Sequence, residues 1–302
     1  MKKLSIAKNY HSFSMEEEVI DDYLVSEKRK KIWRIELDIA EEVKRICEKY
    51  NIKYFIIWGT LLGAVRHDGF IPWDDDFDIG FLREDYIRFC EVVKKEIKYP
   101  YFVQDALSDP QFFIGYTRIR HSESTAWIFR NSNPNYNNGV YVDLYVFDVL
   151  VSNKLLRKVQ FNTIDFLINK AVMYNREPKT IFQKIHNFII PYEYIVKLHQ
   201  KACSIFNFYK NEKVIGPIYS PSEIEQGYWF NRKDVEKTVE LIFEDTTFQA
   251  PKGYKNILKN VYGNYMKFPP REKRGTWHEE QVFFEPEMPY KEFYNLYYAR
   301  RK

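Results

Sequence analysis

The most conspicuous chemical feature of the sequence is a run of acidic residues, Asp74-Asp75-Asp76-Phe77-Asp78. Carboxylates this close repel one another unless a cation lies among them. Side chains two residues apart in a strand share a face, so we expect Asp76 and Asp78 to project together, with Cα atoms ~6.7 Å apart, while Phe77 points into the core. Mg²⁺ and Mn²⁺ prefer oxygen ligands and keep positions for water and phosphate. The run therefore predicts a Mg²⁺ or Mn²⁺ site, with an acidic surface turn as the alternative.

A predicted turn from strand to helix lies shortly before this run. Residues 53–58 are β-branched and aromatic, which is typical of a buried strand, and residues 60–66 predict a short helix. The N-terminus of a helix offers backbone N–H groups and a positive dipole end to a phosphate. Gly59 would allow close approach of that phosphate, and the Thr60 hydroxyl would add a donor. Thr60 as a plain N-cap is the alternative, and both roles are compatible.

A strand, a Gly-Thr turn, a helix and an Asp-x-Asp strand together resemble the nucleotidyltransferase fold. In that fold a third carboxylate from a later strand usually completes the site. The candidate is Asp143, which interrupts the otherwise apolar run of residues 140–147. Burying a carboxylate there without a partner would be costly. Asp148 is the second choice, although a residue at the end of a strand is more often a cap or part of a turn.

Other segments have the periodicities of helices and strands that could position these residues. Apolar residues recur at three- and four-residue steps from Ile32 to Tyr50, which predicts an amphipathic helix that covers a sheet. Further elements are expected as a strand over 76–81, a helix over 84–97, and strands over 101–104, 113–120 and 125–129. The fold class that follows is α+β, a nucleotidyltransferase-like mixed β-sheet flanked by helices, with a mainly helical C-terminal half.

The chain divides by character into three parts. Residues 1–26 are expected to form an N-terminal extension, and residues 27–150 the nucleotidyltransferase-like catalytic core. After Leu150 the pattern turns helical, and a tail rich in proline, glycine and aromatic residues follows. We expect residues 151–302 to complete the substrate site.

The bulk composition excludes several classes of protein. Of the 302 residues, 45% are hydrophobic, which is typical of a globular protein. The net charge of +4 is too small to predict binding of nucleic acid, although a mildly basic surface could favour anionic ligands or a membrane. No run approaches the roughly 20 apolar residues that span a bilayer, and the N-terminus lacks the apolar run of a signal peptide. We therefore expect a cytoplasmic protein that could touch the inner face of the membrane.

The segment from Gly59 to Ile79 resembles the signature of the LicD family. Residues 139–144 and 262–270 are similar to two other segments of that family. Its bacterial members are known as phosphorylcholine transferases that decorate lipopolysaccharide or teichoic acid, and the fukutin-related ribitol-phosphate transferases belong to the same superfamily. The resemblance implies a CDP-linked donor such as CDP-choline, and an acceptor hydroxyl on a glycan or a polyol phosphate.

The resemblance also implies roles for individual residues. One or two Mg²⁺ ions held by Asp76, Asp78 and Asp143 would bridge the diphosphate and stabilise charge on the leaving CMP. The acceptor hydroxyl would attack the phosphorus that bears choline, and Asp143 is placed to orient or deprotonate that hydroxyl.

Three residues near the signature are candidates for contacts with the donor. Arg66 and His67 follow the phosphate-binding helix, where either could contact diphosphate oxygens or simply complement the helix dipole. Trp73 adjoins the acidic run and is the first candidate for an aromatic face against which a quaternary ammonium would lie.

Other functions remain open. The same fold could transfer another CDP-linked alcohol phosphate, such as ribitol phosphate, or carry out true nucleotidyl transfer from an NTP. Release of CMP would indicate the first of these reactions, and release of pyrophosphate the second. A non-enzymatic scaffold or glycan-binding module is disfavoured because the set of carboxylates is intact.

Overall fold

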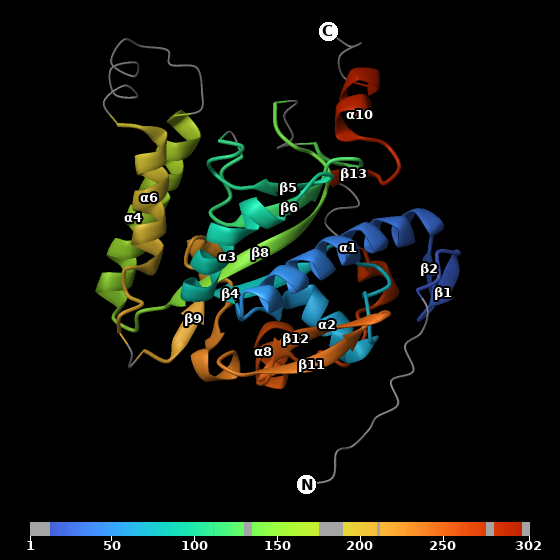
Figure 1. The fold of residues 1–302 in the computed structure, drawn as a ribbon. Coiled ribbons are helices and arrows are strands. Elements are labelled where there is room, and N and C mark those ends of the chain that lie inside the picture. Colours follow the sequence, from blue (N-terminus) through green and yellow to red (C-terminus); the bar gives the residue numbers. More distant parts are fainter. Residues whose placement is uncertain are drawn as a thin grey trace.

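A mixed β-sheet of seven strands forms the centre of the protein (Figure 1). The computed structural model describes residues 13–110, 112–129, 135–174, 190–209, 212–275 and 281–297. The strands of the sheet are β3 (Phe55–Ile56), β4 (Asp78–Leu82), β5 (Tyr101–Gln104), β6 (Thr117–His121), β8 (Val140–Val149), β9 (Val214–Gly216) and β10 (Phe230–Asn231).

Strand β8 is the central strand of this sheet. It runs parallel to β4 along one edge, and along the other edge it pairs antiparallel with β6 and, near its end, with β9. Strand β3 continues the sheet beyond β4, β5 beyond β6, and β10 beyond β9, all antiparallel. Every residue of β8 except Tyr145 is buried. A charged side chain on β8 is therefore surrounded by protein.

The helices of the described residues pack around the sheet. They are α1 (Glu27–Lys49), α2 (Trp58–Arg66), α3 (Arg83–Glu96), α4 (Lys154–Tyr174), α6 (Tyr192–Ser204), α7 (Pro221–Glu225), α8 (Tyr254–Tyr262) and α10 (Tyr290–Tyr297), with short 3₁₀ turns η1 (Arg232–Asp234) and η2 (Arg271–Lys273).

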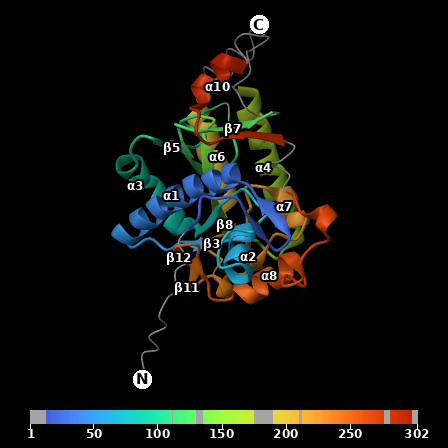
Figure 2. The same cartoon turned by 90° about the vertical axis from the view of Figure 1, so that its right-hand side faces the viewer.

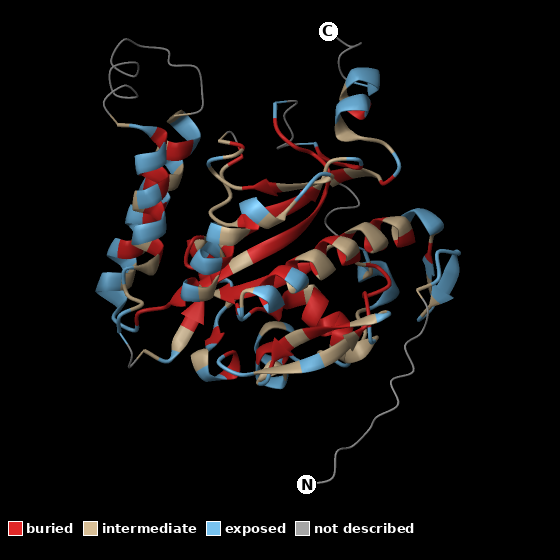
Figure 3. Cartoon of the chain, viewed as in Figure 1, coloured by how far each residue is buried: buried red, intermediate tan, exposed pale blue. Residues whose placement is uncertain are grey.

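Helix α1 confirms the amphipathic helix predicted from Ile32 to Tyr50. Its N-terminus is capped by Ser26, whose hydroxyl accepts a hydrogen bond from the Arg29 N–H at 3.2 Å. Its apolar face is buried against β8 and α3, as Figures 1 and 3 show for the front of the sheet.

Helices α4 and α6 pack against each other at one side of the sheet (Figure 1). The C-terminal half also adds strands to the molecule. The hairpin of β11 (Thr238–Phe243) and β12 (Thr246–Pro251) packs against β3 and α2. Figure 2 shows α2, α8 and this hairpin at the same end of the molecule. The predicted fold class, a mixed sheet flanked by helices, is confirmed.

Two further strand pairs lie outside the main sheet. In the part of the predicted N-terminal extension that is described, β1 (Glu18–Ile20) and β2 (Tyr23–Val25) form a hairpin. Strand β13 (Val282–Glu285) pairs antiparallel with β7 (Thr125–Ile128), which joins the last part of the chain to its middle.

Two element boundaries near the acidic run differ from the prediction. The strand expected over residues 53–58 is only two residues long, because α2 already begins at Trp58. Trp58 has φ +50°, an unfavourable angle for a bulky residue, which its packing against Phe147, Tyr228 and Phe230 compensates. Strand β4 begins at Asp78, so the predicted strand over residues 76–81 starts two residues too early.

Candidate active site

The acidic run lies in the loop between α2 and β4, and only Asp78 belongs to the strand. Thr60 of α2 fixes the start of β4, because the Asp78 N–H donates to the Thr60 hydroxyl oxygen at 2.8 Å. The carbonyl oxygen of Asp74 accepts hydrogen bonds from Arg29 and Trp33 of α1, at 3.0 and 2.8 Å. Two helices therefore hold the loop in place.

Gly59 lies next to two carboxylates of the loop. A Cβ atom at this position would lie 2.6 Å from Asp74 Oδ2 and 3.7 Å from Asp76 Oδ1, so only glycine fits without displacing Asp74. The first turn of α2, with its positive dipole end, thus faces negative charge. The contact of a phosphate with Gly59 and Thr60 stays a prediction. The N-cap alternative for Thr60 is wrong, because Thr60 is the third residue of α2.

Asp78, Asp143 and Arg118 are neighbours on three adjacent strands. Asp78 pairs with Asp143 in register between β4 and β8, and Arg118 pairs with Asp143 between β6 and β8. Arg118 forms a bidentate ion pair with Asp143, in which Nε donates to Oδ1 and Nη2 donates to Oδ2. The Tyr116 hydroxyl also donates to Asp143 Oδ2, at 3.2 Å. Arg118 is therefore the partner that a buried carboxylate on β8 requires.

Burial raises the pKa values of the two aspartates predicted to bind metal. The pKa of Asp76 rises to about 7, through burial first and then through the charges of Asp75 and Asp143. The pKa of Asp78 lies well above its usual range, through burial and then the charges of Asp76 and Asp143. Asp78 Oδ1 is buried and accepts no hydrogen bond from the described residues. A divalent cation beside Asp76 and Asp78 would offset this repulsion and satisfy that oxygen.

The donor set fits Mg²⁺ or Mn²⁺ at Asp76 and Asp78. Carboxylate oxygens are the ligands that these hard ions prefer. Within the described ranges, no three acidic, histidine or cysteine side chains already lie as close together as the ligands of one ion. Asp143 lies beside Asp78, but Arg118 engages both of its oxygens. Asp143 thus lies at the site, but Arg118 occupies the oxygens with which it would bind a metal ion.

Helix α1 contributes a carboxyl group that the sequence analysis missed. Glu36 is buried, and its pKa is raised well above its usual range by burial and then by the charges of Asp75 and Asp76. Its Oε2 has no hydrogen-bond partner among the residues that the structure describes. A signal was present in the sequence, since Glu36 falls four residues after Ile32 and three before Ile39, on the apolar face of the predicted helix.

Tyrosine side chains surround the carboxylates. Tyr145 lies two residues after Asp143 on the same face of β8, and its hydroxyl is 3.5 Å from Asp143 Oδ2. The rings of Tyr145 and Tyr116 stack with centroids 4.9 Å apart. Burial, then the charges of Asp74 and Asp78, raise the pKa of Tyr262 at the end of α8. With 24 tyrosines in the chain, nothing in the sequence distinguished these three.

Arg66 and His67 contact the C-terminal segment. Arg66 Nη1 donates to the carbonyl oxygen of Tyr265 at 3.1 Å, and its guanidinium lies 5.0 Å from the centroid of the Phe268 ring. His67 stacks on the same ring, and burial lowers its pKa to about 4. Both residues thus join the end of α2 to the segment that follows α8. Contact of either with a diphosphate stays a prediction.

Trp73 lies in the same cluster of rings. It is 7% exposed, and the guanidinium of Arg274 lies 4.8 Å from its ring centroid. His67 and Phe268 meet it edge to face. Arginine already provides the cation against this ring, so the structure gives no support to Trp73 as the residue that meets a quaternary ammonium.

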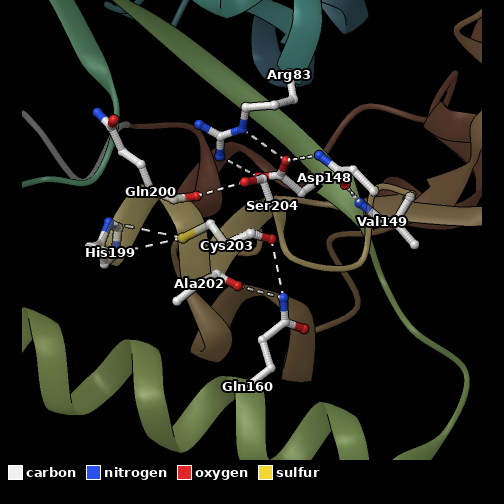
Figure 4. A network of polar contacts seen from close by, with 10 residues as sticks. Arg83, Asp148, Val149, Gln160, His199, Gln200, Ala202, Cys203 and Ser204 are labelled. Carbon is white, nitrogen blue, oxygen red and sulfur yellow. Dashed lines mark hydrogen bonds and ion pairs between the residues drawn. The ribbon is translucent and has the colours of Figure 1, made fainter. Parts of the chain in front are cut away.

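Asp148, the alternative third carboxylate, has a different role. Arg83 of α3 pairs with both of its oxygens (Figure 4). The Asn207 side chain donates to Oδ1 at 2.6 Å. Because side chains alternate along β8, Asp148 lies on the opposite face from Asp143. It connects α3 to the end of β8 and does not belong to the candidate site.

Comparisons with known proteins identify the family of the chain. The family described as LicD/FKTN/FKRP, nucleotidyltransferase domain, matches residues 51–201. Lipopolysaccharide cholinephosphotransferase LicD of Haemophilus influenzae is 26% identical over 265 residues, which cover 82% of this chain and 94% of that protein. An uncharacterised protein of Rickettsia typhi is 35% identical over 138 residues, which cover 42% of this chain and 39% of that protein.

A mouse relative is similar over a shorter part of the chain. Ribitol 5-phosphate transferase FKRP of Mus musculus is 30% identical over 115 residues, which cover 36% of this chain and 20% of that protein. The family match itself spans half of the chain and contains the acidic loop, β4 and β8. The protein therefore belongs to the LicD/FKTN/FKRP nucleotidyltransferase family.

Proposed function

We propose that this protein transfers phosphocholine from CDP-choline to a hydroxyl of a cell-surface glycan, or of a teichoic-acid or lipopolysaccharide precursor, and releases CMP. The observation that carries the proposal is the pair of half-buried Asp76 and buried Asp78, whose charges repel each other beside Asp143. The similarity to the Haemophilus influenzae cholinephosphotransferase supports this choice of substrates, since it covers 94% of that protein. Transfer of an alcohol phosphate is the part of the proposal that the mouse relative also supports.

Asp76 and Asp78 would hold the metal ion. A bound Mg²⁺ or Mn²⁺ would neutralise charge on the diphosphate and on the departing CMP. Asp143 has a separate role, because Arg118 and Tyr116 fix both of its oxygens. We assign to Asp143 the orientation of the acceptor hydroxyl beside the phosphorus, which is the kind of positioning that accelerates a transfer between two substrates.

The proposed reaction forms one bond and breaks one. The oxygen of the acceptor hydroxyl bonds to the phosphorus that bears choline, the bond from that phosphorus to CMP breaks, and CMP leaves with the electron pair. The proton of the hydroxyl passes to a carboxylate of the site.

Product analysis tests this proposal. We expect the purified protein to release CMP from CDP-choline in the presence of a glycan or polyol-phosphate acceptor, and EDTA to abolish the release until Mg²⁺ or Mn²⁺ is added back. A screen should include CDP-ribitol and the four NTPs. Preference for CDP-ribitol would favour the reaction named for the mouse relative, and release of pyrophosphate from an NTP would contradict the proposal. A protein that binds no divalent metal by calorimetry would revive the scaffold alternative.

Contact with a membrane surface is the second part of the proposal. No helix of the described residues is long and apolar enough to cross a bilayer. Helix α4 has apolar residues on two sides. One side packs inward through Ile164, Leu167 and Ala171. The other side is exposed at positions that form one stripe, Leu155 (71%), Val159 (57%), Phe166 (58%) and Met173 (56%).

The charge of α4 suits an anionic surface. The helix carries Lys154, Arg157, Lys158 and Lys170 against a single acidic residue, Asp165. Exposed apolar side chains beside basic ones are typical of a helix that lies in the headgroup region of a membrane. We therefore propose that the exposed side of α4 docks on anionic lipid, near the lipid-linked acceptors expected for this reaction.

A vesicle assay tests the docking. We expect the full chain to sediment with vesicles that contain phosphatidylglycerol, and the double variant Val159→Ser/Phe166→Ser to lose most of this binding. Ile87→Ser, which removes an exposed apolar side chain from α3 (48% exposed), is the matched control and should bind normally. Equal binding by all three proteins would refute the docking. If the double variant instead changed the elution volume from dimer to monomer, the stripe would be an interface between two copies.

A further inference from the structure

A small pocket lies beside the candidate active site, between α4, the loop before β6 and the start of α7. Its volume is about 380 Å³. The residues that line it are Phe113, Ile114, Tyr116, Asp165, Ile168, Tyr219, Ser220, Pro221, Ser222, Glu223 and Glu225. We refer to this space as the acidic pocket, because Asp165, Glu223 and Glu225 supply its charge.

The charge of the acidic pocket is of one sign. None of its lining residues is lysine, arginine or histidine, whereas its wall contains the aromatic rings of Phe113, Tyr116 and Tyr219. An adjoining cavity of about 800 Å³ differs in this respect, since Lys154 and Arg157 are among its lining residues. Carboxylates next to aromatic rings form an environment that favours a cation with an apolar surface.

Tyr116 connects the acidic pocket to the candidate active site. The Tyr116 ring lines the pocket, and its hydroxyl donates to Asp143 Oδ2 at 3.2 Å. Tyr116 therefore belongs both to the wall of the pocket and to the hydrogen-bond partners of Asp143. A ligand that extends from the carboxylates past Tyr116 would place its far end in the pocket.

Two groups of the acidic pocket are incompletely compensated within the protein. Tyr219 is 3% exposed, and its buried hydroxyl has no hydrogen-bond partner among the described residues. The pKa of Glu223 rises to about 7, mainly through burial, with the charge of Asp143 adding to the rise and a hydrogen bond with Ser220 opposing it. Both groups are costly to bury as they stand, and a cation in the pocket would offset the cost at Glu223.

We propose that the acidic pocket binds the positively charged headgroup of the alcohol phosphate that is transferred, with the cation between Glu223 and the rings of Tyr116 and Tyr219. This inference rests on the proposed transfer of an alcohol phosphate and makes it more specific, because it assigns a quaternary ammonium to a defined place. A neutral polyol such as ribitol can donate hydrogen bonds to the same carboxylate but gains no attraction between opposite charges. The pocket therefore selects between the two donor classes that the relatives represent.

A matched pair of donors tests the assignment. The two compounds are CDP-choline and the CDP ester of 3,3-dimethylbutanol, in which a carbon replaces the nitrogen and the charge is lost. We expect wild-type KM to be lower for CDP-choline by about tenfold. Glu223→Gln should remove most of this difference by raising KM for CDP-choline alone, while kcat changes little. An equal rise for both donors would show a merely structural role for Glu223 and overturn the proposal.

Two variants of Tyr219 separate the ring from the hydroxyl. Tyr219→Phe keeps the aromatic face and should keep the preference for choline. Tyr219→Leu loses the face and should weaken that preference. If both variants retained the full preference, the Tyr219 ring would have no part in binding.

A binding measurement distinguishes failure of this inference from failure of the proposed function. Calorimetry with phosphocholine and with its neutral analogue needs no turnover. Preferential binding of phosphocholine that Glu223→Gln abolishes supports the pocket even if no CDP-alcohol is a donor. Turnover of CDP-choline without preference over its neutral analogue would instead retain the function and exclude the pocket.

Discussion

Replacement of Asp78 by asparagine is expected to lower kcat for transfer by about 10²–10³-fold or more while leaving the fold intact. The amide has the shape of the carboxylate but binds a divalent cation poorly. The free energy of unfolding, in contrast to kcat, should not fall. The pKa of Asp78 is raised by burial and by neighbouring negative charges, so its ionised form destabilises the folded protein at neutral pH. In EDTA the melting temperature of Asp78→Asn should therefore equal or exceed that of the wild type.

Asp148→Asn provides the contrast for this variant. Asp148 is a buried aspartate one residue before the end of β8, the strand that pairs with β4, and it is compensated by Arg83. Loss of its charge leaves the guanidinium unpaired and should cost about 3–5 kcal/mol of unfolding free energy. The folded fraction should keep its kcat. For the first variant, near wild-type turnover by a folded Asp78→Asn protein would show that Asp78 does not belong to the active site.

Replacement of Arg118 by methionine should destabilise the metal-free protein by about 3–5 kcal/mol, because the Asp143 carboxylate is left buried without a cationic partner. A divalent cation can then take the place of the guanidinium. We expect 5 mM Mg²⁺, about 100 times a Kd of ~50 μM, to raise the melting temperature of the variant by more than it raises that of the wild type. Thermal unfolding with and without Mg²⁺ measures both effects.

Arg120→Met is the matched control for this prediction. Arg120 lies two residues from Arg118 on β6, is equally enclosed, and also lies over the Tyr141 ring. It donates to Gln104 and to the Gly139 carbonyl oxygen, with no hydrogen bond to Asp143. Its loss should destabilise the protein without any extra response to Mg²⁺. Identical responses of the two variants would mean that Arg118 does not compete with a metal for Asp143.

The helices and strands were predictable wherever a local pattern of apolar residues determined which side chains face the core. The three- and four-residue apolar steps of α1 and the apolar run of β8 describe surfaces that face the core, and both elements formed where expected. The boundary at Trp58 was not predictable. A tryptophan at φ +50° contradicts local preference and is tolerated only because Phe147 and Phe230, distant in sequence, pack around it.

The site was predictable only where a local sequence pattern identified its residues. Asp76 and Asp78 are local in sequence, and Asp143 was identified as a charge inside an apolar strand. Its partner Arg118 comes from a strand that pairs with β8 from the opposite edge, and the sequence carries no sign of that pairing. Glu223 and Tyr219 come from the C-terminal half, where only the folded chain shows which residues lie beside Tyr116, the hydrogen-bond partner of Asp143.

The stacking of His67 on Phe268 joins two segments that lie 201 residues apart in the sequence. Trp73 also meets the Phe268 ring, so cleavage of the chain between α8 and Phe268 should expose His67 and Trp73 to solvent. The acidic loop would still be held by α1 and α2, and the cleaved protein should therefore keep its carboxylates in place while the end of α2 loses its cover.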